Sequence, residues 1–118
     1  GLMVARVGVL LAVAVLLATT SVPAAELHLH HVVNCIEGKD GKNYFAASGD
    51  VCEGMGKGLL QDLQASGMAG GHALPYVEIA QSVSQWGLAQ GMRKDVARAK
   101  AAAEVAHSAL VQAKANFK

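Results

Sequence analysis

The first quarter of the chain is a long apolar run, GLMVARVGVLLAVAVLLATTSVPAA, in which Arg6 is the only charged residue. An apolar core from Val7 to Ala18 is followed by small and polar residues. A short basic flank, an apolar region of about 7–15 residues and a small-residue cleavage site are typical of a secretory signal peptide. A membrane helix needs roughly 20 apolar residues, more than this core offers. We therefore expect residues 1–25 to be a signal peptide cleaved after Ala24 or Ala25, with a retained membrane helix as the alternative.

Residues 26–56 show no extended helical pattern. The segment ELHLHHVVN alternates loosely and fits either a short strand or the first turns of a helix. Asp40-Gly41 favours a tight turn, and the glycine-rich AASGDVCEGMGKG predicts irregular structure. The chain has two cysteines, and an even count in an exported protein predicts a disulfide, here between Cys35 and Cys52. Loop-closure entropy gives such a bond roughly 3 kcal/mol of stabilisation.

The pattern changes to a helical one near Lys57, where three leucines share one face in GLLQDLQAS. Gly67 is expected to end this helix, GMAGGHALP to form a loop, and Pro75 to occupy the first turn of a second helix that ends near Gly91. The apolar positions of that second helix, at steps of three or four, are Tyr76, Ile79, Ala80, Val83 and Trp86.

The last helix has the clearest pattern. Asp95 is a suitable N-cap, and the residues that follow alternate strictly in steps of three and four, as in a coiled-coil seam. The seam residues are Val96, Ala99, Ala103, Ala106, Leu110, Ala113 and Phe117. The predicted fold is mainly α, with an N-terminal apolar helix, a disulfide-stapled loop and an antiparallel three-helix bundle. The expected divisions are residues 1–25, 26–56 and 57–118.

Charge and motifs exclude several functions. The chain has ten basic and nine acidic residues, and one of the basic ones lies in the leader, so the remainder is formally neutral. Nucleic acid is therefore not an expected partner. The segment GDVCEGMGKG lacks the phosphate-loop pattern, because Val51 replaces its first glycine and Gly58 its Ser or Thr. No C-x-x-C pair supports haem attachment, no serine lies in a nucleophile elbow, and we expect no enzymatic activity and no nucleotide or haem cofactor.

The candidate chemistry lies in a histidine cluster, His28, His30 and His31. Neutral imidazole suits copper, zinc and nickel. On a strand His28 and His30 would point the same way, whereas on a helix His28 and His31 would share a face. Glu26 or the amine of a mature chain could add a ligand. The alternative is an exposed polar linker without a specific role.

The segment from Leu59 to Lys114 resembles the small metal-binding proteins of the bacterial periplasm. The similarity lies in LLQDLQASGMAGGHALPYVEIAQSVSQWGLAQG followed by DVARAKAAAEVAHSALVQAK. The resemblance implies an alanine-rich helical bundle that binds copper and other divalent ions through helix-surface histidines. Here only His72 and His107 fall in the matching region. The architecture is therefore expected to carry over, and high-capacity metal storage is not.

Together these features predict a small periplasmic or secreted helical protein, not an enzyme, with a copper, zinc or nickel site at the histidine cluster and an accessory role. The alternative is a structural subunit anchored in the membrane by residues 2–22, whose bundle lies on the periplasmic side and docks on a larger membrane protein complex.

Overall fold

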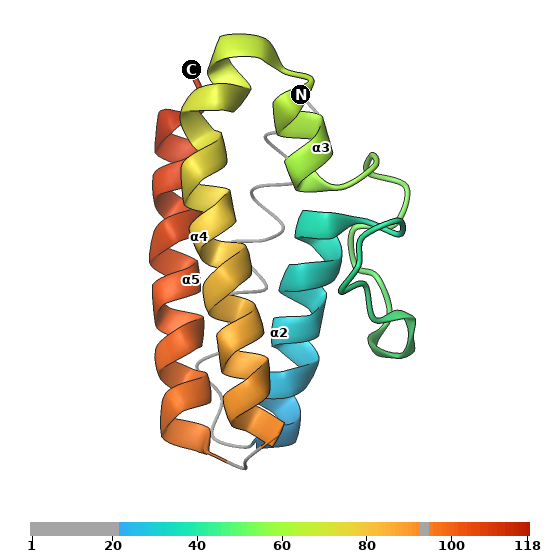
Figure 1. Cartoon of the computed structure of the whole chain (residues 1–118), viewed down its shortest axis with the longest axis vertical. Helices are drawn as coiled ribbons and strands as arrows, with labels where there is room; N and C mark the ends of the chain where they lie inside the picture. Colours follow the sequence, from blue (N-terminus) through green and yellow to red (C-terminus); the bar gives the residue numbers. More distant parts are fainter. Residues whose placement is uncertain (1–21, 93–94) are drawn as a thin grey trace.

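The computed structural model describes residues 22–92 and 95–118, in which there are four α-helices and no strand. Three long helices, α2 (Val22–Glu37), α4 (Gly67–Met92) and α5 (Val96–Asn116), pack as a bundle in which α4 runs antiparallel to the other two (Figure 1). The short helix α3 (Leu59–Gln64) lies beside the end of α2, and a single 3-10 turn, η1 (Ala46–Ser48), interrupts the loop between them. The prediction of a mainly helical fold is confirmed. The predicted N-terminal apolar helix lies almost entirely outside the described residues.

Helix α2 settles the strand-or-helix alternative for the histidine segment. Leu29, Val32, Val33 and Ile36 recur at helical spacing and are fully buried. Gly38, at φ +76°, ends the helix, and its N–H donates to the carbonyl of Asn34 at 2.9 Å. Residues 22–37 thus contribute one of the three long helices of the bundle.

The loop from 38 to 58 leaves and rejoins the helices at one close crossing. A Cβ on Gly38 would lie 2.0 Å from the carbonyl oxygen of Lys57, and one on Gly58 would lie 2.5 Å from that of Glu37. Both glycines also have positive φ. Only glycine fits at this crossing, so the loop is closed at its base by backbone packing.

Helix α4 corrects two predictions. It begins at Gly67 and continues through Pro75, so GMAGGHALP is helical and the proline does not start the helix. The carbonyl of Gly71, which Pro75 leaves without an N–H partner, belongs to an exposed residue and can bind water. The first turn of α4 packs closely on α3, since a Cβ on Gly70 would lie 1.8 Å from the carbonyl oxygen of Leu63. Gly70 thus allows close helix packing, and the segment does not form a loop.

The buried face of α4 also differs from the predicted one. Small residues and one valine face the bundle: Gly70, Ala73, Val77, Ala80, Ser84 and Gly87. Of the predicted apolar positions only Ala80 is fully buried, whereas Ile79 and Trp86 are 49% and 47% exposed. A Cβ on Gly87 would lie 2.5 Å from the Cβ of Ala102, which shows how closely α4 and α5 approach. Close approach through small residues explains why the large side chains are displaced to the flank.

Helix α5 begins as the sequence predicts. Asp95 is its N-cap, and its Oδ1 accepts a hydrogen bond from the Arg98 N–H at 3.1 Å. The Arg98 guanidinium also forms an ion pair with the same carboxylate. The buried residues of the helix are Ala99, Ala102, Ala103, Ala106, Ala109, Leu110 and Ala113, a wider stripe than the strict seam because it adds Ala102 and Ala109. Val96 and Phe117, at the two ends, are half-buried.

Candidate metal site and the disulfide loop

The three histidines of α2 do not converge. His28 and His31, one turn apart, share a face, and their ring centroids are 5.8 Å apart in an edge-to-face arrangement. His30 points elsewhere and stacks on the ring of Phe45, with centroids 4.3 Å apart and an interplanar angle of 24°. The helix therefore divides the cluster into a pair and a stacked ring.

The hydrogen bonding of His31 fixes its tautomer. Its Nε2 lies 2.6 Å from the carbonyl oxygen of Ser48. Because a carbonyl oxygen can only accept, Nε2 carries the proton, and in the neutral ring Nδ1 holds the free electron pair. Metal-binding histidines commonly donate their other ring N–H to a backbone carbonyl in this way. His28 has a complementary feature, since its Nδ1 is buried and has no hydrogen-bond partner among the described residues.

The local electrostatics favour neutral imidazoles. Burial, and then the nearby His31, lower the pKa of His28. Burial is also the main reason why the pKa of His30 is lowered, although the charge of Glu26 acts in the opposite direction. The neutral ring is the form that binds a metal ion. His28 therefore needs no change of protonation at pH 7 to act as a ligand.

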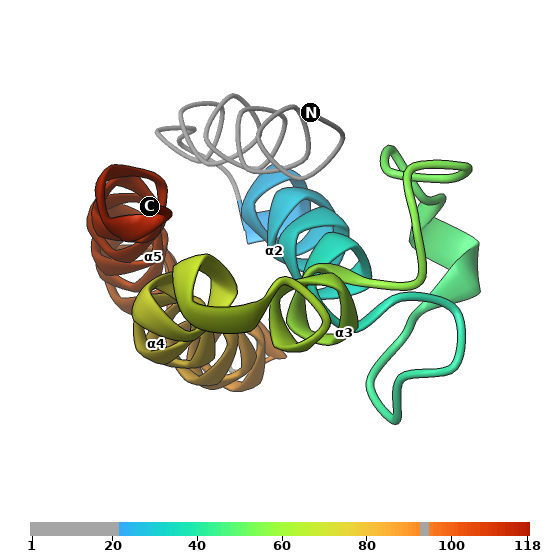
Figure 2. The same ribbon diagram turned by 90° about the horizontal axis from the view of Figure 1, so that it is seen from above.

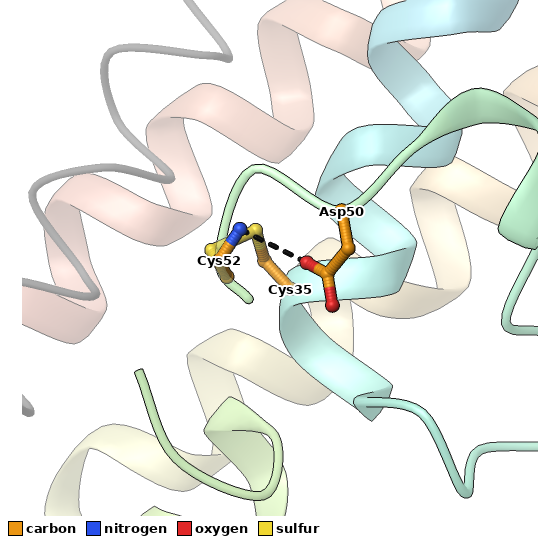
Figure 3. A group of neighbouring side chains, drawn as sticks. All are labelled: Cys35, Asp50 and Cys52. Atoms are coloured by element: carbon orange, nitrogen blue, oxygen red, sulfur yellow. Dashed lines mark hydrogen bonds between the residues drawn. A yellow bond between two sulfur atoms is a disulfide. The ribbon is translucent and has the colours of Figure 1, made fainter. Parts of the chain in front are cut away.

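Among the described residues, one group of three potential metal ligands has its donor atoms within 4.8 Å of one another: Cys35, Asp50 and Cys52 (Figure 3). The two sulfurs form the predicted disulfide, with Cα atoms 5.4 Å apart, and both cysteines are buried. The Oδ1 atom of Asp50 accepts the Cys52 N–H at 2.9 Å, which fixes the turn that leads to the bond. This group is therefore a structural staple in the oxidised chain.

Two polar residues in the last turn of α2 hold the loop, and neither was singled out by the sequence. Asn34 is fully buried and bonds to loop backbone three times. Its Nδ2 donates to the carbonyls of Phe45 and Gly49 at 3.0 and 2.9 Å, and its Oδ1 accepts the Phe45 N–H at 2.8 Å. The side-chain amide of Asn34 thus bonds to both the N–H and the carbonyl of Phe45, before η1, and to the carbonyl of Gly49, after it. The loop is therefore held on both sides of η1.

The second anchor is Glu37, a residue that is 7% exposed. Its Oε1 accepts the Asn43 N–H at 3.0 Å, and its Oε2 accepts the Asn43 Nδ2 at 3.1 Å and the Gln85 Nε2 at 2.9 Å. Burial acts to raise the pKa of Glu37, but these hydrogen bonds and one from Gln81 outweigh it and lower the pKa. The carboxylate therefore stays ionised and links α2, the loop and α4.

A shallow cleft of about 280 Å³ lies against the loop. Cys52 and Asp50 line it, together with Lys39, Glu53 and several glycines. Lys39 and Glu53 form an exposed ion pair at 2.8 Å. The charged residues that line the cleft are two basic and three acidic ones, Lys39, Lys57, Asp40, Asp50 and Glu53, so neither sign of charge dominates it.

The two remaining histidines are separate from the pair. The Nδ1 of His72 lies 2.9 Å from the carbonyl oxygen of Lys118, at the exposed end of the bundle. His107 is half-buried on α5. Neither belongs to a group of three metal donors among the residues that the structure describes.

Comparisons with protein-family models, curated proteins and solved structures gave no match. Within residues 22–92 and 95–118, no helix is both long and apolar enough to cross a membrane.

Proposed function

We propose that this chain is a small exported accessory protein that binds one divalent transition metal ion, copper, zinc or nickel, through His28 and His31 of α2. The observation that carries the proposal is the bond from the His31 Nε2 to the Ser48 carbonyl, which leaves Nδ1 of that ring available beside His28. Two imidazoles one helical turn apart provide two ligands, and water completes the coordination. The role is binding and not catalysis.

The site differs from the one that a free amine would make. A square-planar copper site built from an amine, two backbone amides and His28 requires the backbone at residues 26–28 to leave the helix, and these residues lie inside α2. A site that uses the His28–His31 pair needs no such change. His30 contributes to loop packing through Phe45 and is not assigned as a ligand.

Metal titration of the oxidised protein tests the assignment. Calorimetry with Cu(II), Zn(II) and Ni(II) should give a stoichiometry of about one for at least one of these ions, since a two-histidine pair supplies a single site. His28→Ala together with His31→Ala should abolish that binding, while His72→Ala, the matched exposed control, should leave it unchanged. Equal binding by the double variant and the wild type would refute the site.

Intact mass of the protein from its own host separates this proposal from the membrane-anchored alternative. Loss of residues 1–24 or 1–25 agrees with an exported soluble chain. A mass that retains the apolar segment, with no bound metal, favours an anchored subunit whose histidine segment is a linker.

A further inference from the structure

The loop that joins α2 to α3 contacts the histidine segment through Ser48 and Phe45. The carbonyl oxygen of Ser48 lies 2.6 Å from the Nε2 of His31, and the ring of Phe45 stacks on His30 at a centroid distance of 4.3 Å. Both contacts come from the short stretch of loop around η1, on the side of α2 that faces away from α5 (Figure 2). A bond to this loop therefore orients the His31 ring, whose Nδ1 is the available metal ligand.

Asn34 holds the same stretch of loop at both ends. Its side chain bonds to the N–H and the carbonyl of Phe45 and to the carbonyl of Gly49, so Ser48 lies between two fixed points. Asn34 is fully buried and lies on α2, three residues after His31. The helix that provides the two imidazoles thus also provides the amide that keeps the Ser48 carbonyl in place.

We propose that the loop is the outer shell of the metal site, so that metal binding and closure of the loop on α2 stabilise each other, with Asn34 as the positioning residue that links them. This coupling rests on the proposed function, in which the ion binds His28 and His31. A metal ion on Nδ1 withdraws electron density from the His31 ring and makes its Nε2–H a stronger donor to the Ser48 carbonyl. Conversely, that bond fixes the orientation of the ring and makes Nδ1 a more basic ligand.

The strength of the coupling follows from the chemistry of such outer-shell bonds. Loss of the outer-shell partner of a metal-binding histidine lowers metal affinity about 10–100-fold. Because coupling between two equilibria is reciprocal, the bound ion favours the closed loop over the open loop by the same factor. A variant whose loop is partly open should bind the ion more weakly, in proportion to the fraction of molecules in which the loop is closed.

Calorimetric titration of oxidised Asn34→Ala with Cu(II), Zn(II) and Ni(II) tests the effect of the loop on the metal. The variant keeps both histidines and the disulfide but loses the three bonds to Phe45 and Gly49. Its affinity for the ion that the wild type binds should fall at least about tenfold, with an unchanged stoichiometry.

Glu37→Gln is the matched control for a general loss of stability. Glu37 holds the loop at Asn43, which precedes Phe45 in the chain, and it bonds to neither Phe45 nor Gly49 in the contacts described above. Glu37→Gln should therefore bind the ion as tightly as the wild type does.

Amide hydrogen exchange tests the reverse effect, of the metal on the loop. The Phe45 N–H bonds to Asn34 and the Gly49 N–H to the carbonyl of Ala46, so both report on closure of the loop. Saturation of the wild type with the ion should slow exchange at these two amides about tenfold. In His28→Ala, which keeps the bond from His31 to Ser48 but lacks one ligand, the ion should not change these rates.

Different results overturn the metal site and the coupling. Absence of binding by the wild type, or equal binding after replacement of both His28 and His31, overturns the site and the coupling together. Binding by the wild type that Asn34→Ala matches, or that Asn34→Ala and Glu37→Gln weaken equally, overturns the coupling alone. If circular dichroism shows that Asn34→Ala does not fold, exchange in the wild type decides, and rates that the bound ion leaves unchanged overturn the coupling.

Discussion

Replacing Glu37 with glutamine tests whether the buried carboxylate at the end of α2 holds the loop against the bundle. The substitution keeps the shape of the side chain and an oxygen for the Asn43 N–H. It places an NH₂ group where Oε2 now accepts from the side chains of Asn43 and Gln85. The NH₂ groups of Asn43 and Gln85 would then face another NH₂ group, unless the side-chain amides rotate by 180°.

The expected cost follows from these contacts. Hydrogen bonds to a charged group contribute about 1.5–3 kcal/mol each, and release from the desolvation of a buried charge offsets part of the loss. With the bonds from the Asn43 and Gln85 side chains weakened and that from the Asn43 N–H retained, we expect Glu37→Gln to lower the free energy of unfolding by about 2 kcal/mol at pH 7.

The pH dependence supplies a second readout. The pKa of Glu37 is lowered in the folded protein, so the carboxylate stabilises the fold above the ordinary glutamate value of 4.5. This contribution is lost as the pH falls through the lower, folded pKa. The difference between the wild type and Glu37→Gln should be largest near neutral pH and should shrink below the ordinary value.

Urea denaturation followed by far-ultraviolet circular dichroism, at several pH values and with the disulfide intact, measures both effects. Glu53→Gln is the matched control, because Glu53 is exposed and forms a surface ion pair with Lys39, and its unfolding midpoint should not change. An unchanged midpoint for Glu37→Gln at pH 7, or a loss that is the same at all pH values, would refute the role given to the carboxylate.

Three further experiments test the packing and the loop. Asn34→Ala removes three hydrogen bonds to loop backbone and should cost about 2–3 kcal/mol in urea denaturation, with faster amide exchange near η1; an unchanged exchange rate would show that the amide is not an anchor. Reduction of the Cys35–Cys52 bond should lower stability by roughly 3 kcal/mol, measured as the shift in urea midpoint with and without a dithiol. Gly87→Ala should destabilise the fold, because the added Cβ would lie 2.5 Å from a side chain of α5. Gly71→Ala, which has open space around the added Cβ, should instead stabilise the fold by up to about 1 kcal/mol. Thermal melts that rank the stabilities of the two variants the other way would contradict the packing.

The sequence predicts α5 well because its local signals agree. A capping aspartate, strict steps of three and four and alanine at the contact positions all indicate the same helix and the same face. In α4 the local signals do not agree, because small residues form its contact face and its large apolar residues lie on the flank. The buried and exposed faces of α4 differ in the size of their side chains more than in their polarity. Hydrophobic periodicity alone therefore does not identify the buried face.

The candidate site is predictable only in part. The histidines and the disulfide are visible as residue types, and helical spacing pairs His28 with His31. Nothing near His30 in the sequence indicates that it stacks on Phe45, which lies fifteen positions away. Asn34 and Glu37 stand within an apolar stretch, so only the tertiary contacts of the loop reveal that they are buried and bonded.

The crossing of Gly38 and Gly58 suggests how relatives of this protein can be recognised. A side chain on either glycine would clash with the backbone carbonyl of the residue that precedes the other glycine. The two positions, twenty residues apart, are therefore expected to vary together or not at all. The residues that anchor the loop precede the first glycine directly, as N-C-x-E-G, and the second glycine follows a second cysteine by six positions. A chain that shares this spacing, even with unrelated helices, should contain the same closed loop.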